Sequence, residues 1–181
     1  MEAAVANTLS AGDKVLVVNG GKFGERWGKI CRAYGLVVEE LLVEWGEAVD
    51  PDRVRDALKS DHSIKAVLIQ ASETSTGVKH PTDEIAKITR EREDVILIVD
   101  GITAVGVFPL PFDDTGIDVL VGGSQKAFML PPGLAFAAMS EKAWKFNEKS
   151  SLPKFYFDFR SYLKNAKNNT TPWTPAISLI I

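Results

Sequence analysis

Residues 95–100 are Val-Ile-Leu-Ile-Val-Asp, and residues 117–126 are Ile-Asp-Val-Leu-Val-Gly-Gly-Ser-Gln-Lys. Each stretch begins as a nearly continuous apolar run, which is the pattern of a strand buried on both faces of a parallel sheet. Each then ends on a charged group, Asp100 in the first stretch and Lys126 in a small-residue turn after the second. Ligands of open α/β sheets bind beyond the carboxyl ends of the strands, so both groups are expected at one binding edge.

Helices and strands are predicted to alternate along the whole chain. Apolar runs predict further strands at 14–18, 36–43, 66–69 and 134–139. Apolar periodicity and capping signals predict helices at 2–11, 23–34, 83–91 and 140–148, and one that begins at Asp50-Pro51. This alternation predicts an α/β fold, a three-layer αβα sandwich around a mostly parallel sheet.

The composition is that of an ordinary globular domain. The chain has 181 residues, 45% hydrophobic and 25% charged, which suits one domain with a sizeable core. A net charge of -3 without a basic block argues against nucleic acid as a partner. No apolar run approaches the length of a membrane span, and residues 1–4 lack the features of a signal peptide. One cysteine excludes an internal disulfide and suits a reducing compartment, so a cytoplasmic location is expected.

Asp100 and Lys126 together indicate a particular cofactor. Burial of a lysine at a strand end is expected to lower its pKa below the usual value of about 10.4. The neutral amine can then form a Schiff base with an aldehyde. A carboxylate at the neighbouring strand end can keep a pyridine nitrogen protonated. An imine-forming lysine and a ring-pairing carboxylate are the groups that pyridoxal 5′-phosphate needs, with Asp100 and Lys126 as catalytic residues.

Three ordered blocks carry a family resemblance. They are Glu73-Thr74-Ser75-Thr76-Gly77-Val78, Asp100-Gly101-Ile102-Thr103-Ala104 and Gly122-Gly123-Ser124-Gln125-Lys126. Together they resemble the class V aminotransferases of the fold-type I pyridoxal-phosphate superfamily, most of all the alanine–glyoxylate and serine–pyruvate group. The resemblance covers nearly the whole chain. It implies transfer of an amino group from a small amino acid, of the alanine or serine type, to a 2-oxo acid such as glyoxylate or pyruvate.

The resemblance also implies a set of cofactor contacts. Phe23 would stack on one face of the cofactor ring and Ile102 would lie under the other. The further implied contacts come from Ser75, Thr76 and Gln125 within one subunit, and from Thr170, which would reach the cofactor phosphate of a neighbouring subunit in a homodimer. Simpler interpretations stay open, because Phe23 and Ile102 fit core positions and Ser75 fits an ordinary polar loop.

The resemblance implies a longer protein with two parts. Residues 1–150 match a cofactor-binding large domain, truncated at its N-terminal side, where relatives carry a phosphate-binding loop. Residues 151–181, in which the polar run 164–169 is closely followed by Pro172 and Pro175, are expected to form an extended connection towards a missing C-terminal domain. That domain carries the arginine that grips the substrate carboxylate in relatives, so this chain alone is expected to bind cofactor weakly and turn over poorly.

Two rival functions remain open from the sequence. The first is lyase chemistry on the same fold, such as that of the cysteine desulfurases, which typically have His beside the lysine and a mobile catalytic Cys. Here the neighbour is Gln125, and Cys31 lies on an apolar helix stripe typical of an inert core thiol. The second is a non-catalytic role, like that of family members described as hydrogenase subunits. His62 and His80 show no metal-ligand spacing, so both are expected at the surface or in loops and no metal is predicted.

Overall fold

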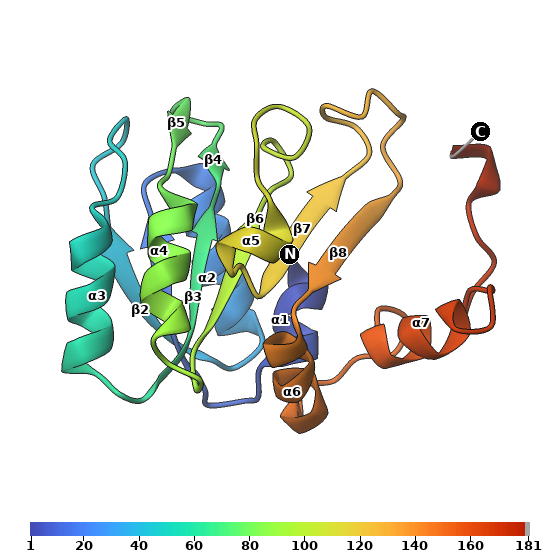
Figure 1. The fold of residues 1–181 in the computed structure, drawn as a ribbon, viewed down its shortest axis with the longest axis horizontal. Helices are drawn as coiled ribbons and strands as arrows, with labels where there is room; N and C mark the ends of the chain where they lie inside the picture. Colours follow the sequence, from blue (N-terminus) through green and yellow to red (C-terminus); the bar gives the residue numbers. More distant parts are fainter. Residues whose placement is uncertain (180–181) are drawn as a thin grey trace.

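A computed structural model, in which residues 1–179 are described, confirms the α/β architecture. Six strands form one sheet in the order β2-β1-β3-β6-β7-β8. Their bounds are β1 Lys14–Asn19, β2 Val37–Leu42, β3 Ile64–Gln70, β6 Ile96–Asp100, β7 Val119–Gly123 and β8 Ala135–Met139. Neighbouring strands are parallel except for β8, which runs antiparallel to β7 at one edge of the sheet (Figure 1).

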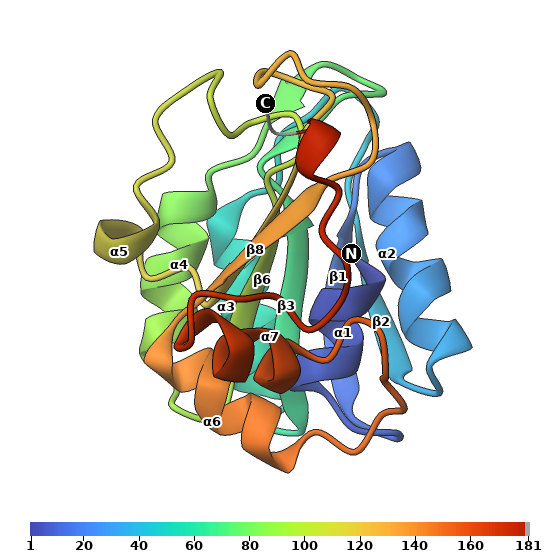
Figure 2. The same cartoon turned by 90° about the vertical axis from the view of Figure 1, so that its right-hand side faces the viewer.

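Helices cover both faces of the sheet, which confirms the three-layer sandwich. One face carries α1 (Glu2–Thr8), α2 (Lys22–Ala33) and α6 (Glu141–Lys149), and the other carries α3 (Pro51–Ser60) and α4 (Thr82–Arg90). Figure 2 shows the strands lying between α2 on one side and α4 on the other. Each interface is a separate hydrophobic core, because alternate residues of every central strand point to opposite faces.

Local capping explains where several helices begin. The Asp50 carboxylate accepts a hydrogen bond from Asp52 N at 3.0 Å, and Pro51 occupies the first helical position of α3. The Ser140 hydroxyl accepts one from Ala143 N at 3.0 Å and starts α6. Both helix starts were predicted from the sequence and are confirmed.

Two local predictions differ from the structure. Helix α1 ends at Thr8 rather than residue 11, since Leu9 already has extended backbone angles. The segment expected to be extended contains α7 (Phe159–Ala166), because the Asp158 carboxylate accepts from Arg160 N at 3.1 Å and caps a helix there. The structure also has elements that the sequence analysis did not predict, namely β4 (Ser72–Glu73), β5 (Val78–Lys79), α5 (Phe112–Thr115) and a short 3-10 helix at Ile177–Leu179.

The alternation of side chains along a strand determines towards which face of the sheet the last residues of β3 and β6 point. Leu68 and Ile98 belong to the core beneath α1 and α2. Two residues further along each strand, Gln70 and Asp100 therefore direct their side chains to that same face. The polar ends of β3 and β6 thus lie beside the beginning of α2. Among residues 1–179, no helix is long and apolar enough to cross a membrane.

Candidate active site

The carboxyl ends of β6 and β7 bring the two predicted catalytic residues to one edge of the sheet. Asp100 is the last residue of β6 and is paired in register with Val121 of the parallel strand β7. Strand β7 ends at Gly123, and Lys126 follows three residues later in the turn that leads towards β8. The shared edge that the sequence predicted is confirmed (Figure 1).

Asp100 is a buried carboxylate, 6% exposed. Its Oδ1 accepts a hydrogen bond from Ile102 N at 2.9 Å. Burial raises the pKa of Asp100 above its ordinary value, and the nearby carboxylate of Glu73 raises it further. The Ile102 N–H, the ammonium group of Met1 and the positive charge of Arg26 act in the opposite direction on that pKa. Ionised Asp100 is therefore a costly charge that a cationic partner would stabilise.

Lys126 is exposed, which corrects the expectation that burial would act on this lysine. Its turn lies beyond the sheet edge, and burial in this segment ends at Ser124. The Lys126 carbonyl accepts from Met129 N at 3.0 Å, and Met129 has a positive φ of 54°. The Ser124 hydroxyl donates to the Pro131 carbonyl at 2.7 Å and fixes the base of the loop. The amine thus stands on a tied turn and is open to solvent.

Phe23 and Ile102 both lie outside the two hydrophobic cores, so neither is a plain core residue. Phe23 is half-buried in the first turn of α2, and the Arg26 guanidinium lies over its ring at 4.8 Å from the centroid. Ile102 follows the end of β6. A Cβ built on Gly123 would lie 3.8 Å from Ile102 Cγ2 and 3.1 Å from Gln125 Oε1. The structure therefore brings Ile102 and Gln125 together at the end of β7.

The hydroxyls of Ser75 and Thr76 are engaged with the protein itself. Ser75 Oγ donates to Glu73 Oε1 at 2.6 Å and accepts from Lys22 N at 3.0 Å. Thr76 Oγ1 donates to the Glu73 carbonyl at 3.3 Å within the β4–β5 turn. Ser75 is thereby linked to the start of α2, one residue before Phe23.

Thr170 lies apart from these residues. It follows α7, its side chain is exposed, and its amide donates to the Asn165 carbonyl at 3.1 Å. None of its hydrogen bonds joins it to another predicted site residue within residues 1–179. Its predicted contact belongs to a neighbouring subunit and stays a prediction.

Two buried polar residues of this edge were given no role by the sequence analysis. Glu73 is fully buried, and its carboxylate accepts backbone N–H groups from the start of α2. Gln70 is fully buried too, and within residues 1–179 neither its Oε1 nor its Nε2 has a hydrogen-bond partner. Glu73 opens the first of the three motif blocks, which is the one signal that could have singled it out.

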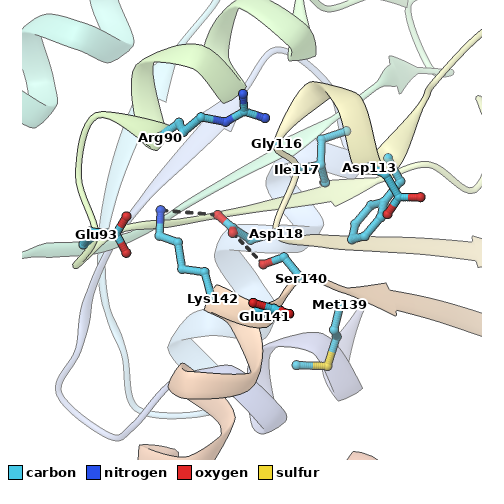
Figure 3. A pocket seen from close by; sticks show the side chains of 11 residues that line it. Arg90, Glu93, Asp113, Gly116, Ile117, Asp118, Met139, Ser140, Glu141 and Lys142 are labelled. Carbon is cyan, nitrogen blue, oxygen red and sulfur yellow. Dashed lines mark hydrogen bonds and ion pairs between the residues drawn. The ribbon is translucent and has the colours of Figure 1, made fainter.

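A pocket at the opposite end of β7 is separate from this edge. Figure 3 shows it between α4, α6 and the residues that precede β7. Asp118 accepts from Leu97 N at 2.9 Å and from Ser140 Oγ at 2.7 Å, and Lys142 Nζ lies 3.7 Å from its carboxylate. Asp118 and Lys142, at the centre of this pocket, are thus paired with each other. None of the predicted site residues lines the pocket. Nowhere in residues 1–179 do three or more His, Cys, Asp or Glu side chains gather as metal ligands.

Comparison with known proteins identifies the family. Residues 1–175 match the family described as "Aminotransferase class-V". The chain is 44% identical to the "Soluble hydrogenase 42 kDa subunit" of Anabaena cylindrica, covering 100% of this chain and 48% of that protein. It is 41% identical to the "L-aspartate--glyoxylate aminotransferase" of Paracoccus denitrificans, covering 99% and 46%.

A solved structure agrees. The alanine–glyoxylate aminotransferase of Nostoc sp. superimposes with a TM-score of 0.92 at 30% identity, covering 99% of this chain and 48% of that one. The chain thus spans about half the length of the curated relatives it matches. The extent of the family match and the shared fold lead to one conclusion: this chain belongs to the class V aminotransferase family.

Proposed function

We propose that this chain is the cofactor-binding part of a pyridoxal 5′-phosphate-dependent aminotransferase. The amino donor is a small amino acid of the alanine or serine type, and the acceptor is a 2-oxo acid of the glyoxylate or pyruvate type. The family match and relatives named as glyoxylate aminotransferases support this choice.

The observation that carries the proposal is the buried carboxylate of Asp100, one strand away from the turn that holds Lys126. Asp100 has a hydrogen bond from Ile102 N but no ion pair among residues 1–179, so its charge has room for a cationic ring nitrogen. When bound, pyridoxal phosphate supplies an electron sink for the bonding pair released at the substrate α-carbon. Asp100 sustains that role by keeping the ring nitrogen protonated.

Lys126 has two roles in this proposal. Its amine would hold the cofactor covalently, and the same amine would move the proton at the substrate α-carbon. Its exposed position at the sheet edge leaves the amine accessible to both partners.

The remaining predicted residues hold the cofactor. Phe23 and Ile102 offer apolar surfaces that project outside the cores, as two ring faces require. Gln125 is exposed beside Ile102, which leaves its amide accessible to a polar cofactor atom. Ser75 and Thr76 shape the neighbouring turn. The Ser75 hydroxyl already donates its proton to Glu73 and accepts from Lys22 N, so only its remaining lone pair is available to the cofactor.

The wider architecture follows the same proposal. Residues 1–150 form the large domain and residues 151–181 connect it to further sequence. A homodimer would place Thr170 on the cofactor phosphate of the neighbouring subunit. A cytoplasmic location belongs to the same proposal, since the single cysteine of these 181 residues suits a reducing compartment.

The test is the visible absorption spectrum after addition of pyridoxal phosphate, followed by borohydride reduction and peptide mapping. A reduced adduct on the peptide that contains Lys126, absent in Lys126→Ala, is the expected result. Lys142→Ala is the matched control, because Lys142 belongs to the opposite end of the sheet and should leave the adduct unchanged.

A chimera makes the result decisive. This chain would replace the matching half of the Anabaena cylindrica relative, which supplies the flanking segments. Absence of the adduct from both this chain and the chimera would reject the cofactor and favour a non-catalytic role, to which the hydrogenase-subunit names of two relatives point. With an adduct in hand, release of ammonia or sulfide without formation of pyridoxamine phosphate would favour a lyase.

A further inference from the structure

Glu73 is an acidic side chain that the proposed chemistry leaves without a task. It is fully buried at the end of β4, which follows β3 along the chain. Its Oε2 accepts from Phe23 N at 3.1 Å and from Gly24 N at 3.0 Å, and its Oε1 accepts from Ser75 N at 3.2 Å. A buried carboxylate with several N–H donors is a stable arrangement, and the start of a 12-residue helix adds favourable dipole charge.

Ser75 extends this arrangement to the residue before Phe23. Its hydroxyl donates to Glu73 Oε1 at 2.6 Å and accepts from Lys22 N at 3.0 Å. Three successive N–H groups of the first turn of α2 are thus held, two by Glu73 and one through Ser75. Helix starts have orphan N–H groups that a side chain on the preceding residue usually caps. Here the preceding residue is Gly21, which has no such side chain, so the cap comes from about fifty positions away in the chain.

The surroundings of Gly21 show how closely the side chains of Glu73 and Ser75 pack against the start of α2. A Cβ at this position would lie 2.5 Å from Glu73 Cδ and 2.6 Å from Ser75 Oγ. Real Cβ atoms essentially never approach other atoms so closely, so any side chain here would displace the carboxylate or the helix. Only glycine lets Glu73 reach the N–H groups.

The held turn carries Phe23, whose ring is not fixed by either core. Gly24 packs against the backbone of Val18 and Asn19, whereas the ion pair of this turn, between Lys22 and Glu25 at 3.3 Å, lies near the surface. The position of the Phe23 ring therefore depends on the backbone of this turn, and that backbone depends on Glu73.

We propose that Glu73 is a positioning residue of the active site: it clamps the first turn of α2 and so sets the Phe23 ring against the cofactor. This rests on the proposed function, because the ring needs a cofactor to stack on. Glu73 does not touch the reacting atoms. It acts through Phe23, with Ser75 as an auxiliary contact.

The first test measures the clamp without any cofactor. Glu73→Gln replaces one acceptor oxygen by an NH₂ group that cannot accept from N–H groups. Amide hydrogen exchange at Phe23 and Gly24 is expected to accelerate at least about tenfold in that variant. Glu25→Gln is the matched control, since it also removes a carboxylate charge close to the first turn of α2, but Glu25 pairs with the side chains of Lys22 and Lys29 rather than with the backbone amides of Phe23 and Gly24. It should leave exchange at these amides close to that of the original protein.

The second test is a double-mutant cycle on cofactor affinity, measured from the visible spectrum of the chain or of the chimera. Phe23→Ala and Glu73→Gln are each expected to weaken pyridoxal phosphate binding about 3- to 10-fold, the scale of one aromatic stacking contact. The double variant should be no weaker than the worse single variant, since both remove one interaction. Multiplied effects would overturn the proposal, because Glu73 would then act independently of Phe23.

The outcomes separate the two proposals. If the Lys126 adduct forms and Glu73→Gln leaves both exchange and affinity unchanged, the role of Glu73 is refuted while the proposed function stands. If no adduct forms in the chain or in the chimera, the proposed function fails and the cofactor role of Glu73 fails with it. Should Glu73→Gln not fold, Ser75→Ala takes its place, with faster exchange expected at Lys22 and the same non-additivity with Phe23→Ala.

Discussion

Gln70 and Asp100 are paired residues on the neighbouring parallel strands β3 and β6, and both are buried. In-register residues of parallel strands direct their side chains to the same face, so the Gln70 amide lies beside the Asp100 carboxylate. Gln70 has no hydrogen-bond partner among residues 1–179, and burial raises the pKa of Asp100. This edge of the sheet therefore holds polar groups whose burial weakens the fold, as is common at functional sites.

Asp100→Asn is expected to stabilise the chain in the absence of cofactor. The folded-state pKa of Asp100 lies above its unfolded value, so the unfolding free energy falls as pH rises from the unfolded pKa through the raised one. At pH 7 Asp100→Asn removes the free-energy cost of burying an ionised carboxylate, and the new Asn amide can donate a hydrogen bond to the Gln70 side chain. Thermal unfolding should show a higher Tm at pH 7, by about 2–4 °C for each kcal/mol, and no gain below about pH 3.5.

Asp94→Asn is the control of opposite sign. Hydrogen bonding from Arg92 lowers the pKa of Asp94 to about 2, so ionised Asp94 stabilises the fold and its removal should lower Tm at pH 7. Cofactor binding should weaken for Asp100→Asn alone. A lower Tm for Asp100→Asn at pH 7 would contradict the assigned sign.

Gly24 and Gly28 offer a matched pair on α2. A Cβ at Gly24 would lie 2.8 Å from Asn19 Cα and 2.8 Å from the Val18 carbonyl oxygen, which are backbone atoms that cannot move aside. At Gly28 the nearest atoms, at 3.0 Å, are the flexible ends of Arg32 and Glu40. Chemical denaturation should show a loss of about 1–3 kcal/mol for Gly24→Ala and a change within about 1 kcal/mol for Gly28→Ala. Equal losses of unfolding free energy for the two variants would mean that α2 can move away from β1 and make room for a Cβ at residue 24.

The sequence could predict the site edge because the signals there are local. Buried strands read as apolar runs, and Asp100 and Lys126 are the charged residues that follow two of them. The parallel order of β6 and β7 then brings them together without any knowledge of side-chain contacts. An apolar run also predicted β8, although this edge strand is largely exposed, and capping residues predicted the helix starts at Asp50 and Ser140.

The sequence could not predict what depends on distant contacts. Glu73 meets α2 across about fifty positions of the chain. His80 lies in the loop after β5, as one of the two expectations had it, but it is buried there, with its Nδ1 accepting from Val49 N. The burial expected of Lys126 was wrong for the same reason, since a local pattern does not report what covers a turn. Helix α7 was missed although its signals are local, since Asp158 marks its start and Phe159, Tyr162, Leu163 and Ala166 recur at helical spacing.

Cys31 is expected to be inert in the folded protein. It lies fully buried in the core under α2, and burial raises the pKa of its thiol to about 12. Since the thiolate is the reactive form, a maleimide at pH 8 should label Cys31 only through unfolding, at a rate that rises with urea. Fast labelling of the native chain would contradict the core assignment and reopen the desulfurase alternative.

His80 is expected to make the fold sensitive to acid. Its Nδ1 accepts from Val49 N at 3.1 Å, which requires the neutral ring, and burial lowers its pKa below the ordinary 6.5. The unfolded chain therefore binds a proton before the folded one does. The unfolding free energy contributed by His80 is fully present above about pH 6.5 and is lost as pH falls towards the depressed pKa, with a slope of up to about 1.4 kcal/mol per pH unit.

His80→Gln keeps an acceptor for Val49 N without a titrating group, so urea unfolding between pH 7 and 5 should show a shallower decline of the unfolding free energy. His62→Gln, at an exposed position, should follow the original protein. Identical slopes for all three proteins would show that acid acts elsewhere in the fold.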